Sequence, residues 1–210
     1  MTINEDKLKP KYGYEEGWSD AVDKETADKA LSYKKDFLKQ FIAINQNEID
    51  KRLGGQKYWV TLKYDGEYAD IFHDGKQTIT LNRSARVRRG LPCIEEVGEL
   101  LTKAGINEAV IPAEIYYYND GKRARLGQLL SAFADEKKID NLRLAIYDIQ
   151  EIDGKPFRTQ NYQETYDKIT EIFGKGKLCH PVEMQVANSN QEVKNIFQKW
   201  VVEENHEGLV

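Results

Sequence analysis

Cysteine is scarce in this chain of 210 residues, and long apolar runs are missing. Its two cysteines, Cys93 and Cys179, form neither a disulfide framework nor a metal-binding spacing, so we expect two reduced thiols. No apolar stretch is long enough to cross a bilayer, and residues 1–18 lack the apolar middle of a secretory signal. These absences disfavour a disulfide-rich secreted protein and a helical membrane protein, and they predict a cytoplasmic protein.

The composition predicts a folded domain rather than a general nucleic-acid binder. Hydrophobic residues make up 40% of the chain and charged residues 31%, which provides enough apolar side chains for a packed core. The net charge is −4, yet positive charge is concentrated in two stretches. These are "NRSARVRRG", with Arg83, Arg86, Arg88 and Arg89, and "GKRARLG", with Lys122, Arg123 and Arg125. Such patches on an acidic chain indicate a confined anionic partner, unless both are solvated turns.

Residues 1–53 are expected to form a helical lead-in. Apolar residues recur at helical spacing between Ala27 and Ile42, and glycines at 54 and 55 mark a stop. The period then changes, because residues 58–63, 68–73 and 77–82 are short stretches rich in β-branched and aromatic residues. Asp-Gly pairs separate these stretches, which predicts three antiparallel strands joined by tight turns.

The remaining chain alternates helical and strand patterns. Helices are expected at 92–104, 126–135, 161–174 and after the capping box of Ser189 and Glu192, and strands at 108–118, 142–150, 180–187 and from 206 onward. This interspersion favours an α+β fold with mainly antiparallel sheets flanked by helices.

Five residues that could bind a nucleotide fall on or near the predicted strands. Lys63 lies in "KYDG", Arg83 in "LNRSA", Glu114 in "IPAEIYYY", Tyr147 in "LRLAIYD" and Glu207 in "EGLV". Lysine and arginine suit phosphate, an aromatic ring suits a base, and carboxylates suit a sugar hydroxyl or a divalent metal. Each also has a structural interpretation: a solvated strand end, a turn cation, a structural ion pair, a core tyrosine or a frayed terminus.

In this order the motifs resemble those of the covalent nucleotidyltransferase superfamily, which includes ATP-dependent DNA ligases, RNA ligases and mRNA capping enzymes. "KYDG" is similar to its nucleophile motif K-x-D-G, "LNRSA" to the motif that holds an arginine, and "PAEIYYY" to the motif with a sugar-contacting glutamate. "AIYDI" resembles the strand whose aromatic residue stacks on the base, and "EGLV" the motif whose glutamate helps hold the metal. The resemblance covers residues 58–210 and implies a nucleotidyltransferase (ATP-grasp-like) core at 54–210.

The resemblance implies the adenylation domain of an ATP-dependent DNA ligase, acting in DNA replication or repair. Lys63 would attack the α-phosphorus of ATP and carry AMP, which then passes to a 5′-phosphate before a 3′-hydroxyl seals the break. The same resemblance implies that ATP is bound by Leu62, Lys63, Arg83, Glu114 and Tyr147, that Mg²⁺ is bound by Glu207 and Glu114, and that nicked DNA or RNA ends are bound by Arg86, Arg88 and Arg89. A monomer is expected.

Departures from the family pattern leave alternatives open. Many DNA ligases and capping enzymes have an arginine five residues after the nucleophile, where this chain has Tyr68, and Tyr147 stands where phenylalanine is common. The chain ends at Val210, before the lysines of the family's last motif and the oligonucleotide-binding barrel that usually follows. We therefore expect a fragment with low or no activity. An RNA ligase, an RNA-capping guanylyltransferase and a catalytically silent nucleic-acid-binding module are the alternatives.

Overall fold

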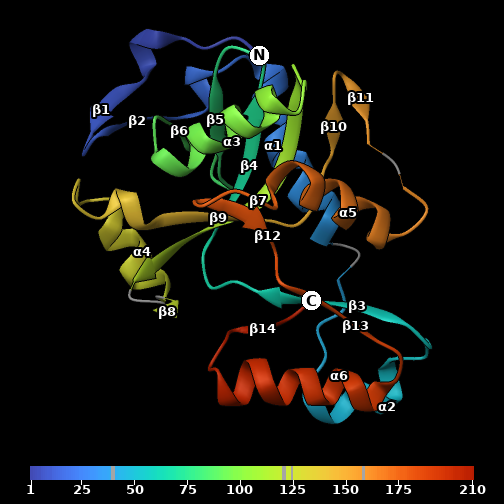
Figure 1. Cartoon of the computed structure of the whole chain (residues 1–210). Helices are drawn as coiled ribbons and strands as arrows, with labels where there is room; N and C mark the ends of the chain where they lie inside the picture. The colour runs from blue at the N-terminus through green and yellow to red at the C-terminus, as the bar shows by residue number, and fades with distance from the viewer. Residues whose placement is uncertain (39–40, 120–121, 124, 158) are drawn as a thin grey trace.

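Two β-sheets of unequal size form the framework of the molecule (Figure 1). The computed structural model describes residues 1–210 except 39–40, 120–121, 124 and 158. Within those residues the large sheet contains β1 (Lys9–Lys11), β2 (Tyr14–Gly17), β4 (Glu67–His73), β5 (Thr78–Leu81), β6 (Val87–Arg89), β7 (Ala109–Asn119), β8 (Lys122–Arg123), β9 (Leu142–Ile146), β10 (Glu151–Ile152), β11 (Lys155–Pro156) and β12 (Cys179–Pro181). The small sheet contains β3 (Tyr58–Lys63), β13 (Met184–Ala187) and β14 (Gly208–Leu209).

Helices cover both faces of the large sheet and the outer face of the small one. They are α1 (Lys24–Leu38), α2 (Ile49–Arg52), α3 (Pro92–Lys103), α4 (Leu126–Ala132), α5 (Tyr162–Phe173) and α6 (Asn190–Phe197), the last continued by a π-helical turn at Gln198–Glu203. α3 and α5 lie on one face of the large sheet and α1 on the other, while α2 and α6 lie beneath the small sheet (Figure 1). The expected α+β fold with mainly antiparallel sheets is confirmed. Among the described residues, no helix has the length and apolar character needed to cross a membrane.

The central strands are buried on both faces because both faces are covered. In β4, Ile71 packs with α3 and α5, whereas its neighbour Phe72 packs with Ala27 and Ala30 of α1. Successive side chains of a strand point to opposite faces, so a strand between two helical layers has no face exposed to solvent. Nearly every pairing in the large sheet is antiparallel, and β12 pairs with β9 in parallel.

The chain crosses between the two sheets at points where the sequence predicted continuous strands or hairpins. All three strands predicted over 58–82 are present, and β4 and β5 form the predicted antiparallel hairpin, but the predicted pairing of the first strand with the second is wrong, because β3 pairs with β13 and β14. The predicted strand at 180–187 is likewise two strands, β12 in the large sheet and β13 in the small one. A short polar turn serves a hairpin and a crossing equally well, so the local pattern could not distinguish them.

The N-terminal segment contains strands that the sequence did not predict. β1 and β2 form a hairpin, and β2 pairs with β6, so Lys9–Gly17 extends the large sheet. The helical part of the expected lead-in is present as α1 and α2. The strands "KPK" and "YEEG" lack the apolar alternation by which half-buried strands are identified, because they pair with each other and β2 pairs with the charged residues Arg88 and Arg89 of β6.

Candidate active site

Lys63 lies at the end of β3, and the last residues of the chain are paired with that strand. β14 runs antiparallel to β3 and places Gly208 opposite Lys63. This pairing brings the carboxylate of Glu207 to the amine, and the two side chains form an ion pair. The side chains remain 47% and 35% exposed, so a ligand can reach the amine. The expected strand at "EGLV" therefore supplies a carboxylate directly to the lysine of "KYDG".

Gly66 brings the loop after Lys63 into direct contact with β7. A Cβ atom at Gly66 would lie 2.3 Å from the Ile115 carbonyl oxygen and 2.9 Å from Cγ of Glu114. The glycine is therefore required by close approach of the two segments, since its φ is not in the left-handed region. Glu114, which the sequence marked as an acid in an apolar strand, consequently lies next to the loop that Lys63 begins.

Tyr147 follows β9 and lies where the two sheets meet. Its ring packs against the apolar cluster of the small sheet, and its carbonyl accepts a hydrogen bond from the Tyr162 hydroxyl at 2.9 Å. Burial, and after it the negative charge of Glu114, raises the pKa of Tyr147 well above its usual value. The ring therefore stays neutral, and it is close enough to Glu114 for charge on that carboxylate to affect it.

An aromatic pair that the sequence did not predict lies beside these groups. Tyr68 is opposite Glu114 in the β4–β7 register and is 3% exposed. Its ring stacks on that of Tyr33 in α1, with centroids 6.5 Å apart and planes at 13°. Tyr33 donates a hydrogen bond to Asp148, the residue after Tyr147. Where the family commonly has an arginine, this chain thus has a buried ring covered by α1. The apolar spacing in α1 contained no signal that singles out Tyr33.

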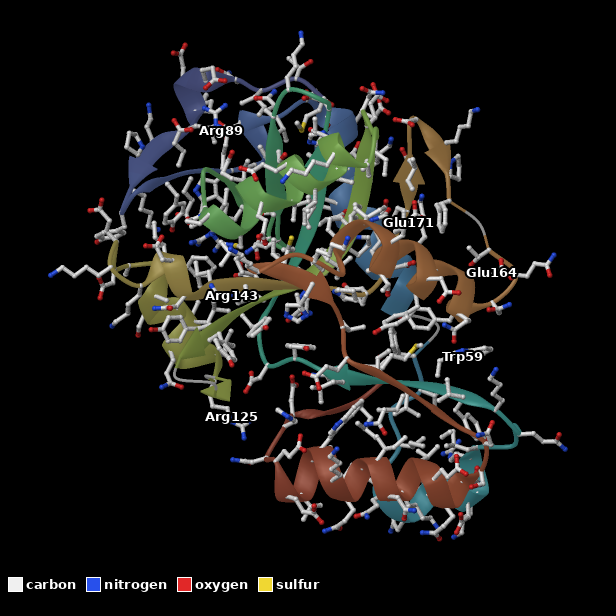
Figure 2. All side chains as sticks on the ribbon, in the orientation of Figure 1. Trp59, Arg89, Arg125, Arg143, Glu164 and Glu171 are labelled. Carbon is white, nitrogen blue, oxygen red and sulfur yellow. The ribbon has the colours of Figure 1, made fainter. Side chains whose placement is uncertain are left out.

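Asp65 of "KYDG" binds a residue from the second basic stretch. Arg125 Nη1 lies 3.2 Å from Asp65 Oδ2, and Arg125 Nη2 donates to the Asn205 side chain at 3.0 Å. Figure 2 shows Arg125 below α4, on the side of the C-terminal segment. The contact ties the loop after Lys63 to the turn before Glu207. The side chains of Lys122 and Arg123, from the same basic stretch, lie outside the part of the chain that the structure describes.

Arg83 is exposed on the turn between β5 and β6. Its neighbour Asn82 donates from Nδ2 to Glu67 at 3.0 Å. Glu67 directly follows Gly66, so the turn that carries Arg83 is joined to the segment that carries Lys63. The motifs "KYDG" and "LNRSA" are therefore connected through Glu67 and Asn82, which neighbour these motifs' predicted functional residues.

Arg88, predicted to contact nucleic acid, is instead a core residue. It is 2% exposed, and its guanidinium group pairs with Glu16 and Glu67. The prediction that Arg88 reaches a nucleic-acid backbone is therefore wrong. The reason is the pairing of β2 with β6, which places Glu16 opposite Arg88. Because β2 was not predicted, no acidic partner was expected for this arginine.

Arg86 and Arg89 are also paired with acids of the N-terminal segment. Arg86 Nη1 lies 3.3 Å from Glu16, and Arg89 lies 2.7 Å from Glu15 and 2.6 Å from Glu5. Figure 2 places Arg89 at the upper end of the molecule, well separated from Arg125 and the small sheet. Contact of Arg86 and Arg89 with nucleic acid remains a prediction, and these acids already offset their positive charge.

Leu62, predicted to bind the nucleotide, packs into the interior. It is 2% exposed and belongs to the apolar cluster under the small sheet. Its backbone amide donates to the Glu183 carbonyl at 2.9 Å. Strand alternation sends the side chains of Leu62 and Lys63 to opposite faces of β3, and contact of Leu62 with the nucleotide remains a prediction.

The site contains carboxylates suited to Mg²⁺, but the described residues do not form a complete set of protein ligands for a metal ion. Within the described ranges, no group of three or more His, Cys, Asp or Glu side chains is arranged to hold a metal ion. Mg²⁺ is usually bound by one or two carboxylates together with waters and substrate phosphates, and it rarely has an all-protein cage. Glu207 beside Lys63 and Glu114 beside Gly66 are such carboxylates. The donor set fits Mg²⁺ held together with a nucleotide.

The site thus combines a lysine at a strand end, carboxylates on two neighbouring segments and an aromatic ring where the two sheets meet. A family model described as "ATP dependent DNA ligase domain" matches residues 36–210. The chain belongs to this family. A DNA ligase from Thermococcus onnurineus (strain NA1) is 26% identical over 157 residues, which cover 71% of this chain and 27% of that protein. The chain thus spans about a quarter of the length of this curated relative.

Solved structures with the same fold include DNA ligases. The match to the structure named "Pmar-Lig_Pre." covers 90% of this chain and 46% of the chain in that structure, with a TM-score of 0.61 and 16% identity. The match to an ATP-dependent DNA ligase from bacteriophage T7, in complex with ATP, covers 80% of this chain and 60% of the ligase chain, with a TM-score of 0.53 and 16% identity. At these identities the likeness establishes the fold alone.

Proposed function

We propose that residues 54–210 form the adenylation core of an ATP-dependent DNA ligase and that Lys63 carries AMP. The observation that supports this most is the junction of "KYDG" with "EGLV" and β7. There the pairing of β3 with β14 joins Lys63 to Glu207, and the missing side chain of Gly66 admits Glu114. A solvated strand end would need neither contact.

The first step is attack by the Lys63 amine on ATP. A lysine amine must lose a proton before it can act as a nucleophile, so the ion pair with Glu207 separates and the proton goes to solvent. The lone pair of Nζ then forms an N–P bond with the α-phosphorus, and Nζ releases a second proton to solvent. The bond from this phosphorus to the bridging oxygen of the β-phosphate breaks, and pyrophosphate leaves with the electron pair. The product is a lysyl-AMP phosphoramide.

The other residues orient the nucleotide. Tyr147 stacks on the base, Glu114 accepts hydrogen bonds from the ribose, and Arg83 contacts phosphate or ribose. Glu207 and Glu114 would hold Mg²⁺ together with the nucleotide phosphates, and the ion would supply positive charge that offsets the negative charge of these phosphates. The neutral, half-buried ring of Tyr147 suits stacking on a purine, because a phenolate in this environment would be costly.

AMP then passes from Lys63 to the 5′-phosphate of a nicked strand, with cleavage of the N–P bond and return of a proton to the amine. The neighbouring 3′-hydroxyl attacks the activated phosphate and displaces AMP. The chain acts on nicked DNA as a monomer in the cytoplasm, in replication or repair, and Arg86 and Arg89 contribute charge toward the nucleic-acid backbone.

The test is covalent labelling with Mg²⁺ and either α-labelled ATP or α-labelled GTP, followed by denaturation. Label from ATP that survives denaturation and is absent from Lys63→Ala supports the proposal. Lys57→Ala, which removes a lysine six positions earlier in the chain, serves as the matched control and should label normally. Label from GTP alone would point to a capping guanylyltransferase. Failure to bind ATP in a calorimetric titration would contradict a nucleotide site altogether and leave a silent module.

An RNA ligase is a second candidate because of Tyr68. The position that commonly holds a phosphate-binding arginine is here a buried ring stacked on Tyr33. Incubating the labelled protein with nicked DNA and with nicked RNA duplexes in parallel distinguishes the DNA ligase from the RNA ligase. Transfer of AMP to DNA ends supports the first candidate, and transfer to RNA ends alone supports the second.

A further inference from the structure

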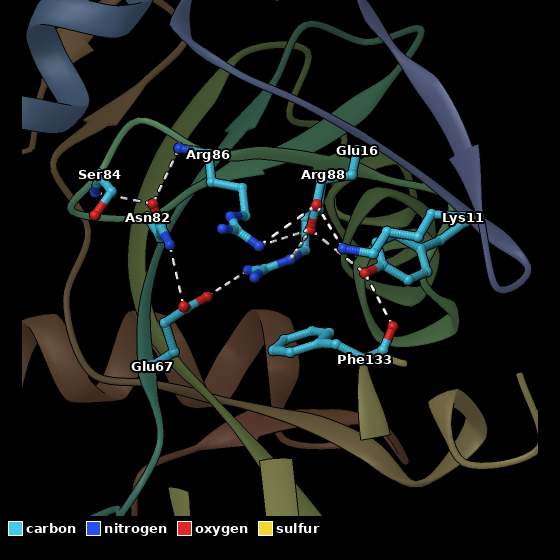
Figure 3. Close-up of polar contacts among 9 residues, drawn as sticks. Lys11, Glu16, Glu67, Asn82, Ser84, Arg86, Arg88 and Phe133 are labelled. Atoms are coloured by element: carbon cyan, nitrogen blue, oxygen red, sulfur yellow. Dashed lines mark hydrogen bonds and ion pairs between the residues drawn. The ribbon is translucent and has the colours of Figure 1, made fainter. Parts of the chain in front are cut away.

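A chain of polar contacts leads from the N-terminal hairpin to the predicted motifs (Figure 3). In the hairpin, Glu16 accepts a hydrogen bond from Lys11 at 2.7 Å and pairs with Nε of Arg88 at 3.4 Å. Nη1 of Arg88 binds Glu67, and Glu67 accepts from Asn82 at 3.0 Å. The contacts therefore run from β2 through β6 and β4 to the turn that carries Arg83.

Asn82 shapes that turn. Its Oδ1 accepts the backbone amides of Ser84 at 2.9 Å and Arg86 at 3.0 Å. Ala85 within the turn has a φ of 56°, in the left-handed region that non-glycine residues rarely occupy. The turn thus adopts a conformation that its backbone does not prefer, and the Asn82 side chain compensates by satisfying two of its amides.

Glu67 fixes the orientation of the Asn82 amide. An ionised carboxylate can only accept hydrogen bonds, so Nδ2 of Asn82 must face Glu67. Oδ1 is then the atom that faces the amides of Ser84 and Arg86. If Glu67 turned away, Asn82 could rotate its amide and lose the two contacts that hold the turn.

Arg88 in turn prevents Glu67 from moving. Its guanidinium group lies 3.9 Å over the ring of Phe133, and the Phe133 carbonyl accepts from the Tyr14 hydroxyl at 3.2 Å. A cation this deeply buried becomes very costly when one of its acidic partners is withdrawn. Glu67 is therefore held by Arg88, and Arg88 is held from the other side by Glu16.

We propose that Glu16, Arg88, Glu67 and Asn82 are positioning residues that hold the Arg83 turn in its reactive geometry. The inference rests on the proposed function, in which Arg83 contacts the nucleotide. Glu16 and the β1–β2 hairpin precede residue 36, where the match to the ligase family begins. The N-terminal hairpin is then a working part of the nucleotide site, acting at a distance through a buried arginine.

The first test is hydrogen exchange at the amides of Ser84 and Arg86. Glu16→Gln keeps the shape of the side chain but removes the charge that holds Arg88, and it should speed exchange at both amides about tenfold, equivalent to a loss of about 1.4 kcal/mol. Glu67→Gln should also speed exchange at both amides. A glutamine side chain can both donate and accept hydrogen bonds, so it no longer fixes the orientation of the Asn82 amide. The matched control is Arg89→Gln, which breaks ion pairs to the same N-terminal segment outside this network and should leave both amides protected.

Two exchange results would overturn the proposal. One is unchanged protection in Glu16→Gln and Glu67→Gln. The other is equal loosening in Arg89→Gln, which would show that any damage to the hairpin has the same effect.

The second test asks whether Asn82 acts through Arg83. ATP affinity is measured in the parent, Asn82→Ala, Arg83→Ala and the double variant. Each single change should weaken binding about tenfold, and the double variant should bind no more weakly than Arg83→Ala alone. Additive losses would refute positioning of Arg83 by Asn82. If the parent does not bind ATP, the proposed function fails, and the exchange measurements still decide whether the network holds the turn.

Discussion

Gly66→Ala should disturb the site through a single added methyl group. In the structure the new Cβ would lie 2.3 Å from the Ile115 carbonyl oxygen and 2.9 Å from Cγ of Glu114. Ordinary contact begins at about 3.4 Å, so the loop and β7 must separate by roughly 1 Å. β7 is a central strand with neighbours on both sides, so we expect the loop to move and carry Lys63 away from Glu114.

The cost has two measurable parts. Overpacking of this kind should lower the free energy of unfolding by about 1–3 kcal/mol, measured by urea denaturation. A displacement near 1 Å at a reacting group should slow formation of lysyl-AMP by about 100-fold. The control is Gly54→Ala, because no atom lies within 4 Å of a Cβ placed there, and both quantities should stay near those of the parent. Equal stability and labelling in Gly66→Ala and Gly54→Ala would refute the close approach of loop and β7.

Three further predictions concern stability. Burial raises the pKa of Asp70 to about 7 from the ordinary 3.8, so the folded state retains a proton that the unfolded chain releases, and stability falls as pH rises between these values. Asp70→Asn should therefore be more stable than the parent at pH 8, by on the order of 2–4 kcal/mol, and the gain should shrink toward pH 4; a gain independent of pH would contradict this. Arg88→Met leaves two acids without their buried partner and should cost about 3–5 kcal/mol in urea unfolding, whereas Arg89→Gln should cost less than about 1 kcal/mol; equal costs would contradict the burial of Arg88. Ser189→Ala removes the cap that accepts the Glu192 amide at 3.2 Å and should lower the unfolding free energy by about 1 kcal/mol, a result that an unchanged urea midpoint would exclude.

The elements of the fold could be predicted from the sequence where one local pattern determines them. The helix at 92–104 begins at a proline and ends at a glycine with φ of 72°, and both signals lie within the segment itself. The strand at 58–63 has its predicted bounds, but its partners lie more than a hundred residues away in sequence. Which sheet a strand joins depends on such distant pairings, so the crossing at Gly66 could not be anticipated.

The candidate site was predictable to the extent that its residues occur in short motifs. The motifs singled out Lys63 and Glu207, which the structure brings together in an ion pair, whereas Arg88 was misjudged and Tyr33 was missed. Arg88 was misjudged because a charged residue is usually exposed, and its burial depends on acids from an unpredicted hairpin. Tyr33 was missed because α1 docks through small residues such as Ala30, while Leu31 in the same apolar pattern is 44% exposed.

The central claim is that the amine of Lys63 forms the covalent bond to AMP. Peptide mass spectrometry at neutral pH, after incubation with ATP and Mg²⁺, locates any adenylyl group directly, since a phosphoramide is preserved away from acid. We predict a single adenylyl group on the peptide that contains Lys63, absent when that residue is alanine. An adenylyl group on Lys57 or any other residue, with Lys63 unmodified, would contradict the account.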